Sequence, residues 1–141
     1  MLVESVGTAV LERLSWDQDT LTHLPQSRGP AAHVWTRTGL TPADVDVALL
    51  YDGFTFNALS WMEGLGFCGP GEATDFIGDG KTIALDGRLP LNPHGYGFVR
   101  EAMLQLCGDA SGRQVEGARV AVVTAGGGVP SAAAPAQASS S

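Results

Sequence analysis

Two short segments combine titratable side chains with glycines, and they are the parts of this sequence best suited to chemistry. Tyr51 and Asp52 follow a compact apolar run, and residues 94–97 read His-Gly-Tyr-Gly. A tyrosine hydroxyl can transfer protons near neutrality where its surroundings lower its pKa from about 10. Glycines let a ligand approach the backbone closely. Tyr51, His94 and Tyr96 are therefore candidate catalytic residues, and the alternative is two tight turns whose tyrosines only pack.

Other residue types with chemical potential point more weakly to function. Cys68 follows the end of an expected helix, whereas a nucleophilic cysteine is favoured at a helix start or beside a basic partner, and Cys107 falls late in another helix. Both are interpreted as structural. Residues 126–128 are three glycines with no Lys-Ser/Thr after them, so they form no phosphate loop. A turn beside a thioester and a plain loop both remain open for them. The acidic residues of 72–86 lack regular metal-ligand spacing, so no metal site is expected.

The elements that must position these residues alternate between strands and helices. Residues 45–51 are a compact apolar run typical of a strand buried on both faces. After Gly53, apolar residues recur at helical spacing until Gly66, which is suited to a helix C-cap. Residues 98–107 predict an amphipathic helix, and residues 118–124 predict another buried strand. The fold class is therefore α/β, with both candidate segments at strand ends, where such folds bind ligands.

The remaining segments give further expectations. Residues 2–10 predict a strand, and residues 30–38 predict a helix with Pro30 in its first turn. Residues 81–85 and 88–91 predict a hairpin around Asp86 and Gly87. The domain is expected to occupy residues 1–128. Residues 129–141 are mostly Ala, Ser and Pro and are expected to be a disordered tail, because they bury too little apolar surface.

Composition excludes several classes of function. The 141 residues carry a net charge of −7 with a sequence pI of about 4.7, which disfavours nucleic acid and anionic membranes as partners. No apolar run is long enough to span a membrane, and the N-terminus has no signal-peptide pattern. Two cysteines make no disulfide framework. We therefore expect a cytoplasmic protein with no metal.

Taken together, several motifs resemble the C-terminal half of the sterol-carrier-type thiolases. The similarity covers roughly residues 1–128 and rests on residues 40–47 (LTPADVDV), 51–55 (YDGFT), 65–68 (LGFC), 89–92 (LPLN) and 113–121 (RQVEGARVA). The resemblance implies an α/β domain that is the C-terminal half of the αβαβα layered thiolase fold, and hence an incomplete one.

Within that superfamily the sequence is most similar to aldolases that shorten steroid side chains on CoA thioesters. Thiolases of this branch carry His-Asp-Cys-Phe after the strand, and here Tyr51 stands in place of that histidine. The resemblance implies that Tyr51, Tyr96 and His94 handle protons in retro-aldol cleavage of a β-hydroxyacyl-CoA, with the acid and base not assigned. It also suggests a set of substrate-binding residues, namely Asp52, Asn92, Gly95, Gly97 and Gly127.

The sequence departs from this family in three respects. The N-terminal half is missing, the loop between Asn92 and His94 is shortened, and the tail stands where a closing strand would pair, which leaves an exposed sheet edge. We therefore expect activity only together with an N-terminal half or a partner. The resemblance implies a homodimer and a small OB-fold, zinc-ribbon partner. Coenzyme A enters as part of the substrate, with no other cofactor.

Two alternative functions remain. One is a thiolase-type acyltransferase, which the absence of a cysteine at a helix start disfavours. The other is a non-catalytic fragment or a lipid- or partner-binding module, which the three departures favour. Half of a two-lobed fold normally hides one apolar face, so the chain alone is expected to oligomerise or to be poorly soluble.

Overall fold

The computed structural model describes residues 1–9, 25–92, 97–126 and 131–138. This part of the chain contains both helices and strands, so the predicted α/β class is confirmed, although the two kinds of element do not alternate strictly. The strands are β1 (Leu2–Val3), β2 (Gly7–Ala9), β3 (Val47–Leu49), β4 (Val120–Ala125) and β5 (Ser131–Gln137). The helices are α1 (Pro25–Trp35), α2 (Thr55–Leu65), α3 (Ala73–Ile77) and α4 (Phe98–Cys107).

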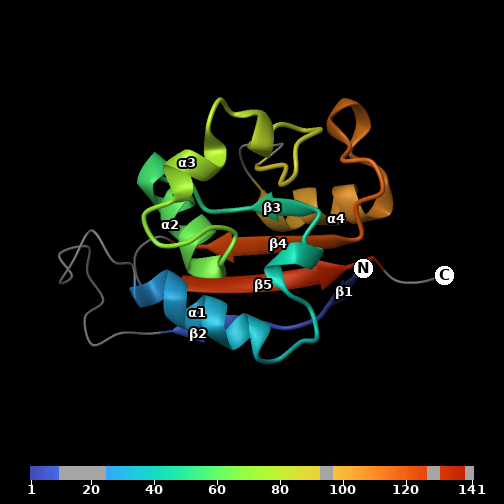
Figure 1. Cartoon of the computed structure of the whole chain (residues 1–141). Coiled ribbons are helices and arrows are strands. Elements are labelled where there is room, and N and C mark those ends of the chain that lie inside the picture. Colours follow the sequence, from blue (N-terminus) through green and yellow to red (C-terminus); the bar gives the residue numbers. More distant parts are fainter. Residues whose placement is uncertain (10–24, 93–96, 127–130, 139–141) are drawn as a thin grey trace.

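The described strands form one mixed sheet in the order β1-β5-β4-β3, with β2 also paired to β5 (Figure 1). β3 and β4 run parallel, with Val47 opposite Ala121 and Leu49 opposite Val123. β5 runs antiparallel to β4 on one side and to β1 and β2 on the other. The parallel pair therefore lies at one end of the sheet, and its two carboxyl ends are adjacent.

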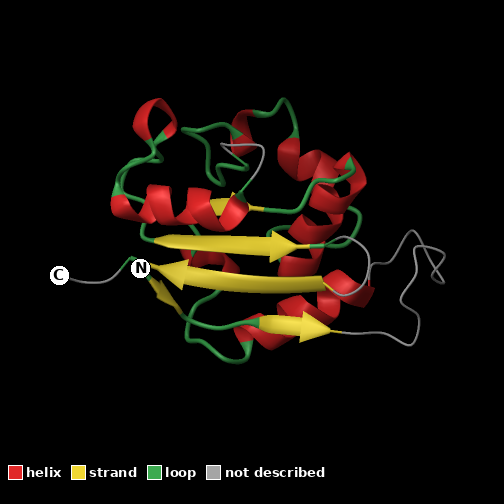
Figure 2. Ribbon diagram, turned by 180° about the vertical axis from the view of Figure 1, so that it is seen from behind, coloured by secondary structure: helices red, strands yellow, loops and turns green. Residues whose placement is uncertain are grey.

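Helices cover both faces of this sheet. α1 and α2 pack on one face, and α4 lies across β3 and β4 on the other (Figures 1 and 2). β3 is fully buried, and its side chains alternate between the two layers. Ala48 packs with the α1–α2 layer, whereas Val47 and Leu49 pack with α4. The prediction of a strand buried on both faces is confirmed, although regular pairing covers only Val47–Leu49 and leaves Tyr51 just beyond the strand.

The two helices nearest the candidate site agree with the sequence pattern. α2 ends at Gly66, whose φ of +82° is a left-handed conformation that glycine adopts readily. α4 spans the predicted residues and begins after Gly97 at φ +79°. α1 differs, because it begins at Pro25 and holds Pro30 in its interior. An interior proline removes one helix hydrogen bond, and the burial of Ala31 and Val34 against the sheet offsets that loss.

The hairpin predicted around Asp86 and Gly87 is wrong as a pair of strands. Lys81–Ile83 form one turn of 3₁₀ helix instead. The two arms still contact each other, since the Leu89 N–H donates to the Thr82 carbonyl at 2.9 Å and the Leu91 N–H to the Ile83 carbonyl at 3.2 Å. The turn is correct, but the first arm curls into a short helix.

The disordered tail is also wrong over residues 131–137, which form β5 near the middle of the sheet. Its pairing with β4 covers the edge that was expected to be exposed. The prediction of disorder from alanine-rich composition considers only the burial of side chains. It ignores the backbone hydrogen bonds that this segment makes to strands on both sides. Pro135 is accommodated as well. Its carbonyl accepts the Glu4 N–H at 3.1 Å, in the gap between β1 and β2. In an antiparallel strand the N–H and the carbonyl of one residue point to the same side, so the N–H that proline lacks would also have pointed into this gap.

An apolar surface lies on the α4 side of the sheet, where α4 covers β3 and β4 and leaves β5 open (Figure 2). Exposed apolar side chains from α4 and from the N-terminus border it, and a groove of about 220 Å³ runs between them. The groove is lined by Met1, Val3, Val99, Ala102, Val123, Thr124, Ala125, Ala134 and Ala136. Contiguous exposed apolar surface of this kind favours association. Among the described helices, none is both long and apolar enough to cross a membrane.

We therefore expect the purified chain to self-associate through this surface. Light scattering after size exclusion should give a mass above 14.6 kDa that rises with concentration. Val99→Glu should lower that mass, because it places a charge on the exposed side of α4. Leu85→Glu, at another exposed apolar position outside the groove, is the matched control. Equal masses for both variants would show that association uses a different surface.

Candidate functional site

The carboxyl ends of three parallel segments meet at one edge of the sheet. Tyr51 and Asp52 follow β3, and Gly126 follows β4. Leu91 forms a parallel bridge with Ala48, so Asn92 continues a third segment beside β3. Ligands of α/β proteins bind at such carboxyl ends. The topology thus gathers residues from distant parts of the sequence into one candidate site.

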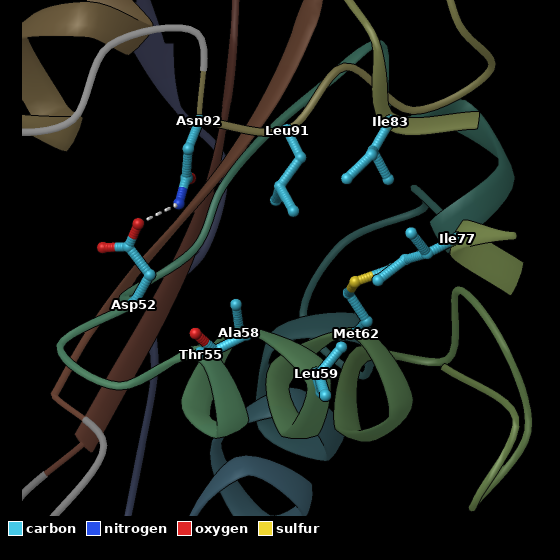
Figure 3. Close-up of a pocket in the computed structure, with 9 residues that line it drawn as sticks. All are labelled: Asp52, Thr55, Ala58, Leu59, Met62, Ile77, Ile83, Leu91 and Asn92. Carbon is cyan, nitrogen blue, oxygen red and sulfur yellow. Dashed lines mark hydrogen bonds between the residues drawn. The ribbon is translucent and has the colours of Figure 1, made fainter. Parts of the chain in front are cut away.

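The side chain of Asn92 holds the exit of β3 from one side. Its Oδ1 accepts the Leu50 N–H at 2.7 Å, and its Nδ2 donates to the Leu50 carbonyl at 2.8 Å. Nδ2 also donates to Oδ2 of Asp52 at 3.1 Å (Figure 3). Asn92 has a φ of +44°, which asparagine tolerates better than most residues. The carboxamide therefore extends the strand pairing by one residue and fixes the Asp52 carboxylate.

Tyr51 is held from the other side of β3. Its N–H donates to Oγ1 of Thr124, a buried residue of β4, at 2.7 Å. The half-buried ring packs against the core and folds back over Gly53. A Cβ built on Gly53 would overlap the Tyr51 hydroxyl oxygen and lie 2.6 Å from Cζ. Glycine at position 53 is thus what permits this placement of the phenol.

A pocket of about 270 Å³ lies between α2 and the segment from α3 to Asn92, and Tyr51 is not among the residues that line it. It is lined by Asp52, Thr55, Ala58, Leu59, Met62, Ile77, Ile83, Leu91 and Asn92. Figure 3 shows the hydrogen-bonded Asp52 and Asn92 at one end and Ile77, Ile83 and Met62 at the other. Such a pocket suits a ligand with an apolar body and a polar group at one end.

The structure brings three of the predicted site residues together, namely Tyr51, Asp52 and Asn92. Gly97 is the N-cap of α4. His94, Gly95, Tyr96 and Gly127 lie outside the described residues, so their roles remain predictions. The start of the glycine run is held by Trp61, whose Nε1 donates to the Gly126 carbonyl at 3.0 Å. Within the described ranges, no cluster of three His, Cys, Asp or Glu side chains could hold a metal ion.

The sequence analysis did not identify two residues that hydrogen-bond to the candidate site, Thr124 and Trp61. Thr124 gave a weak signal, because it is the polar last position of an apolar run, Val-Ala-Val-Val-Thr. Trp61 gave no signal, because a tryptophan on the inner side of a helix normally only packs. Contacts of both span more than sixty residues of sequence. Only the topology of the sheet reveals them.

The two cysteines lie away from this site. Neither Cys68 nor Cys107 lines the pocket. Burial raises the pKa of the Cys68 thiol to about 11, and the carboxylates of Glu63 and Glu72 add to the effect. A catalytic thiolate requires the opposite shift. Cys68 therefore remains a neutral thiol near neutrality, in agreement with its interpretation as structural.

Comparison with known proteins identifies the family. The family model described as thiolase C-terminal domain-like matches residues 7–136. The chain belongs to the thiolase C-terminal domain-like family. This domain is 46% identical over 127 residues to the 17-hydroxy-3-oxo-4-pregnene-20-carboxyl-CoA lyase of Mycobacterium tuberculosis, covering 83% of this chain. It is 40% identical over 126 residues to the steroid side-chain-cleaving aldolase of Thermomonospora curvata, covering 82% of this chain. It spans 32% of the length of each of these two relatives.

A solved structure supports the same assignment. The Ltp2-ChsH2(DUF35) aldolase superposes with a TM-score of 0.87 at 30% sequence identity, over 96% of this chain and 39% of that one. The predicted thiolase-like α/β fold, as a partial chain, is therefore confirmed. More distant relatives include an acetyl-CoA acetyltransferase of Methanothermobacter thermautotrophicus, 32% identical over 144 residues and covering 93% of this chain and 36% of that one.

The raised pKa of Cys68 predicts selective alkylation of this thiolase C-terminal-like domain. At pH 8 only about one Cys68 thiol in a thousand is ionised, so iodoacetamide should modify the exposed Cys107 at least tenfold faster. The Cys68 rate should then rise as the pH approaches 11. Peptide mass spectrometry of timed samples measures both sites. Equal rates at pH 8 would contradict the environment described for Cys68.

Asn92→Asp tests the hydrogen bonds at the exit of β3. The change replaces Nδ2 with an oxygen that faces the Leu50 carbonyl and the Asp52 carboxylate. It should lower the free energy of unfolding by about 1–3 kcal/mol. Asp86→Asn exchanges the same two groups in an exposed turn and should change it by less than about 0.5 kcal/mol. Denaturant unfolding compares the variants, and equal stabilities would argue against the role of Asn92.

Proposed function

We propose that this domain is the C-terminal part of an acyl-CoA lyase that shortens a steroid side chain by retro-aldol cleavage of a β-hydroxyacyl-CoA. The observation that carries the proposal is the position of Tyr51, which is hydrogen-bonded through its backbone at the carboxyl end of β3 and directly precedes Asp52, a residue that lines a pocket with one polar end. Two relatives with 40% identity or more support it, since one is named a carboxyl-CoA lyase and the other a steroid side-chain-cleaving aldolase. The activity is proposed for the whole protein, of which this chain spans about a third by comparison with them.

The reaction needs two proton transfers. A base removes the proton of the β-hydroxyl, the bond between the α and β carbons breaks, and a carbonyl forms at the β carbon. The electron pair of that bond becomes the enolate of a shorter thioester, which an acid then protonates at its α carbon. We assign these transfers to Tyr51 and Tyr96 with His94, without dividing the roles between the tyrosines.

The pocket gives the rest of the substrate a place to bind. Its apolar end suits a hydrocarbon body, and its polar end, at Asp52 and Asn92, suits an oxygen of the reacting group. The Asn92 carboxamide already makes three hydrogen bonds to the protein, so it has one acceptor position left for a ligand. Gly95, Gly97 and Gly127 complete the proposed binding set by allowing the thioester to approach the backbone.

The proposal extends to partners and location. We infer a homodimer and a small OB-fold, zinc-ribbon partner from the family resemblance, and the two components in the name of the Ltp2-ChsH2(DUF35) aldolase support a partner protein. The apolar groove beside α4 provides surface for such contacts. A cytoplasmic location fits the acidic composition and the use of coenzyme A thioesters.

A thiolase-type acyltransferase is less well supported by the site. That reaction needs a thiolate nucleophile. Within this chain, Cys68 is held neutral and neither cysteine lines the pocket. Retro-aldol cleavage needs only proton transfer and enolate stabilisation, which suits a phenol at the strand end.

Tyr51→Phe tests the proposal in the full-length enzyme with any partner it requires. Removing the hydroxyl should lower kcat by about 10²-fold or more, the range for a general acid or base, with KM changed less than about threefold. The assay follows release of the shortened CoA thioester by mass spectrometry. Unchanged kcat in this variant would exclude Tyr51 from the chemistry.

Gly53→Ala is a second test, which changes the placement of the Tyr51 phenol. The new Cβ displaces the Tyr51 phenol without removing it, so kcat should fall between the values of the wild type and Tyr51→Phe. Gly39→Ala is the matched control, because a Cβ there meets no atom within 4 Å. An active Gly53→Ala enzyme beside an inactive Tyr51→Phe enzyme would show that the phenol acts from another position.

A further inference from the structure

The pairing of β3 with β4 ends in an unusual way. The regular ladder stops at Leu49 opposite Val123. Beyond it, the Tyr51 N–H bonds to the side-chain hydroxyl of Thr124 at 2.7 Å. A side chain thus supplies the acceptor that a backbone carbonyl would supply in a continuing ladder, and the chain can turn away from the sheet while remaining attached to it.

The surroundings of Thr124 make the burial of its hydroxyl energetically unfavourable. Thr124 is 1% exposed and is the next-to-last residue of a strand whose other members are valine and alanine. Placing a hydroxyl in such a position is unfavourable unless it is hydrogen-bonded. Its observed partner is the amide of Tyr51. The polar side chain therefore fits its site because of Tyr51, and packing alone would favour valine.

The exit of β3 is fixed on both flanks. Leu50 is bonded to the Asn92 side chain on one side, and Tyr51 to the Thr124 side chain on the other. Two consecutive residues are thus held by opposite neighbours, and Asp52 alone separates them from Gly53, over which the phenol folds. Loss of the Thr124 hydrogen bond would free the backbone from which the phenol projects.

We propose that Thr124 is a positioning residue, whose hydroxyl fixes the backbone of Tyr51 and thereby sets where the Tyr51 phenol stands. The inference rests on the proposed function, in which Tyr51 transfers a proton. Misplacing a reacting group by about 1 Å can lower a rate about 10²-fold, so loss of this one hydrogen bond is expected to lower kcat. Thr124 itself need not touch the substrate.

Two substitutions isolate the hydroxyl. Thr124→Val removes it and keeps the branched shape, whereas Thr124→Ser keeps it and loses the methyl group. In the full-length enzyme, hydrogen exchange followed by mass spectrometry on peptides that contain Tyr51 should be at least tenfold faster at that amide in Thr124→Val and near wild type in Thr124→Ser. If the valine variant does not fold, Thr124→Ala removes the same group without adding a second methyl.

Measurements of kcat and KM distinguish a positioning role of Thr124 from an effect on general stability. Thr124→Val should lower kcat at least tenfold with KM within twofold, and Thr124→Ser should restore kcat to within twofold of wild type. Unchanged exchange at Tyr51 in the valine variant, or faster exchange with unchanged kcat, would overturn the proposal. If the wild-type enzyme releases no shortened thioester while exchange still separates the two variants, the retro-aldol function fails and the fixing of Tyr51 by Thr124 stands.

Discussion

The parallel pairing of β3 with β4 is the constraint on which the rest of this domain depends. β3 is buried on both faces, so each of its backbone polar groups needs a partner from the protein. β4 supplies partners on one side and residues 90–92 on the other. Since parallel strands end at the same edge, this pairing brings the residues after β3 and β4 together. Where regular pairing stops, the side chains of Asn92 and Thr124 provide the hydrogen-bond partners of Leu50 and Tyr51.

The helix on the opposite face is fixed by a buried polar cluster far from the site. Glu101 of α4 is fully buried and accepts two hydrogen bonds from Arg113, at 3.0 and 2.8 Å. Gln105 donates to the Arg113 carbonyl and accepts the Val115 N–H, both at 2.8 Å. The Arg113 side chain of this ion pair is partly exposed, so the pair itself adds little net stability. Its hydrogen bonds join α4 to residues 113–115, in the segment that leads from α4 to β4.

Sequence reasoning succeeded where apolar period and glycine position carry the information. β3, α2 and α4 follow from continuous or helical apolar patterns and from glycines at helix ends. It failed for β5, because this alanine-rich strand is stabilised by backbone pairing on two sides, and backbone pairing cannot be recognised from residue composition.

The same distinction holds for the site. Tyr51 and Asp52 were identified as candidates because they follow a run that predicts a buried strand, whereas Asn92 was named through the family resemblance. The hydrogen bond between Tyr51 and Thr124 joins residues 73 positions apart and depends on which strands are neighbours. The proposed lyase reaction and the alternative transferase reaction share a chemical step, because cleavage of a β-hydroxythioester and of a β-ketothioester both release a thioester enolate. They differ at the other carbon, where a ketone must be attacked by a nucleophile but a hydroxyl need only lose its proton. The described part of this site offers a phenol, a carboxylate and a carboxamide, and its pocket contains no thiol. Such groups can carry the proton transfers of the proposed lyase reaction.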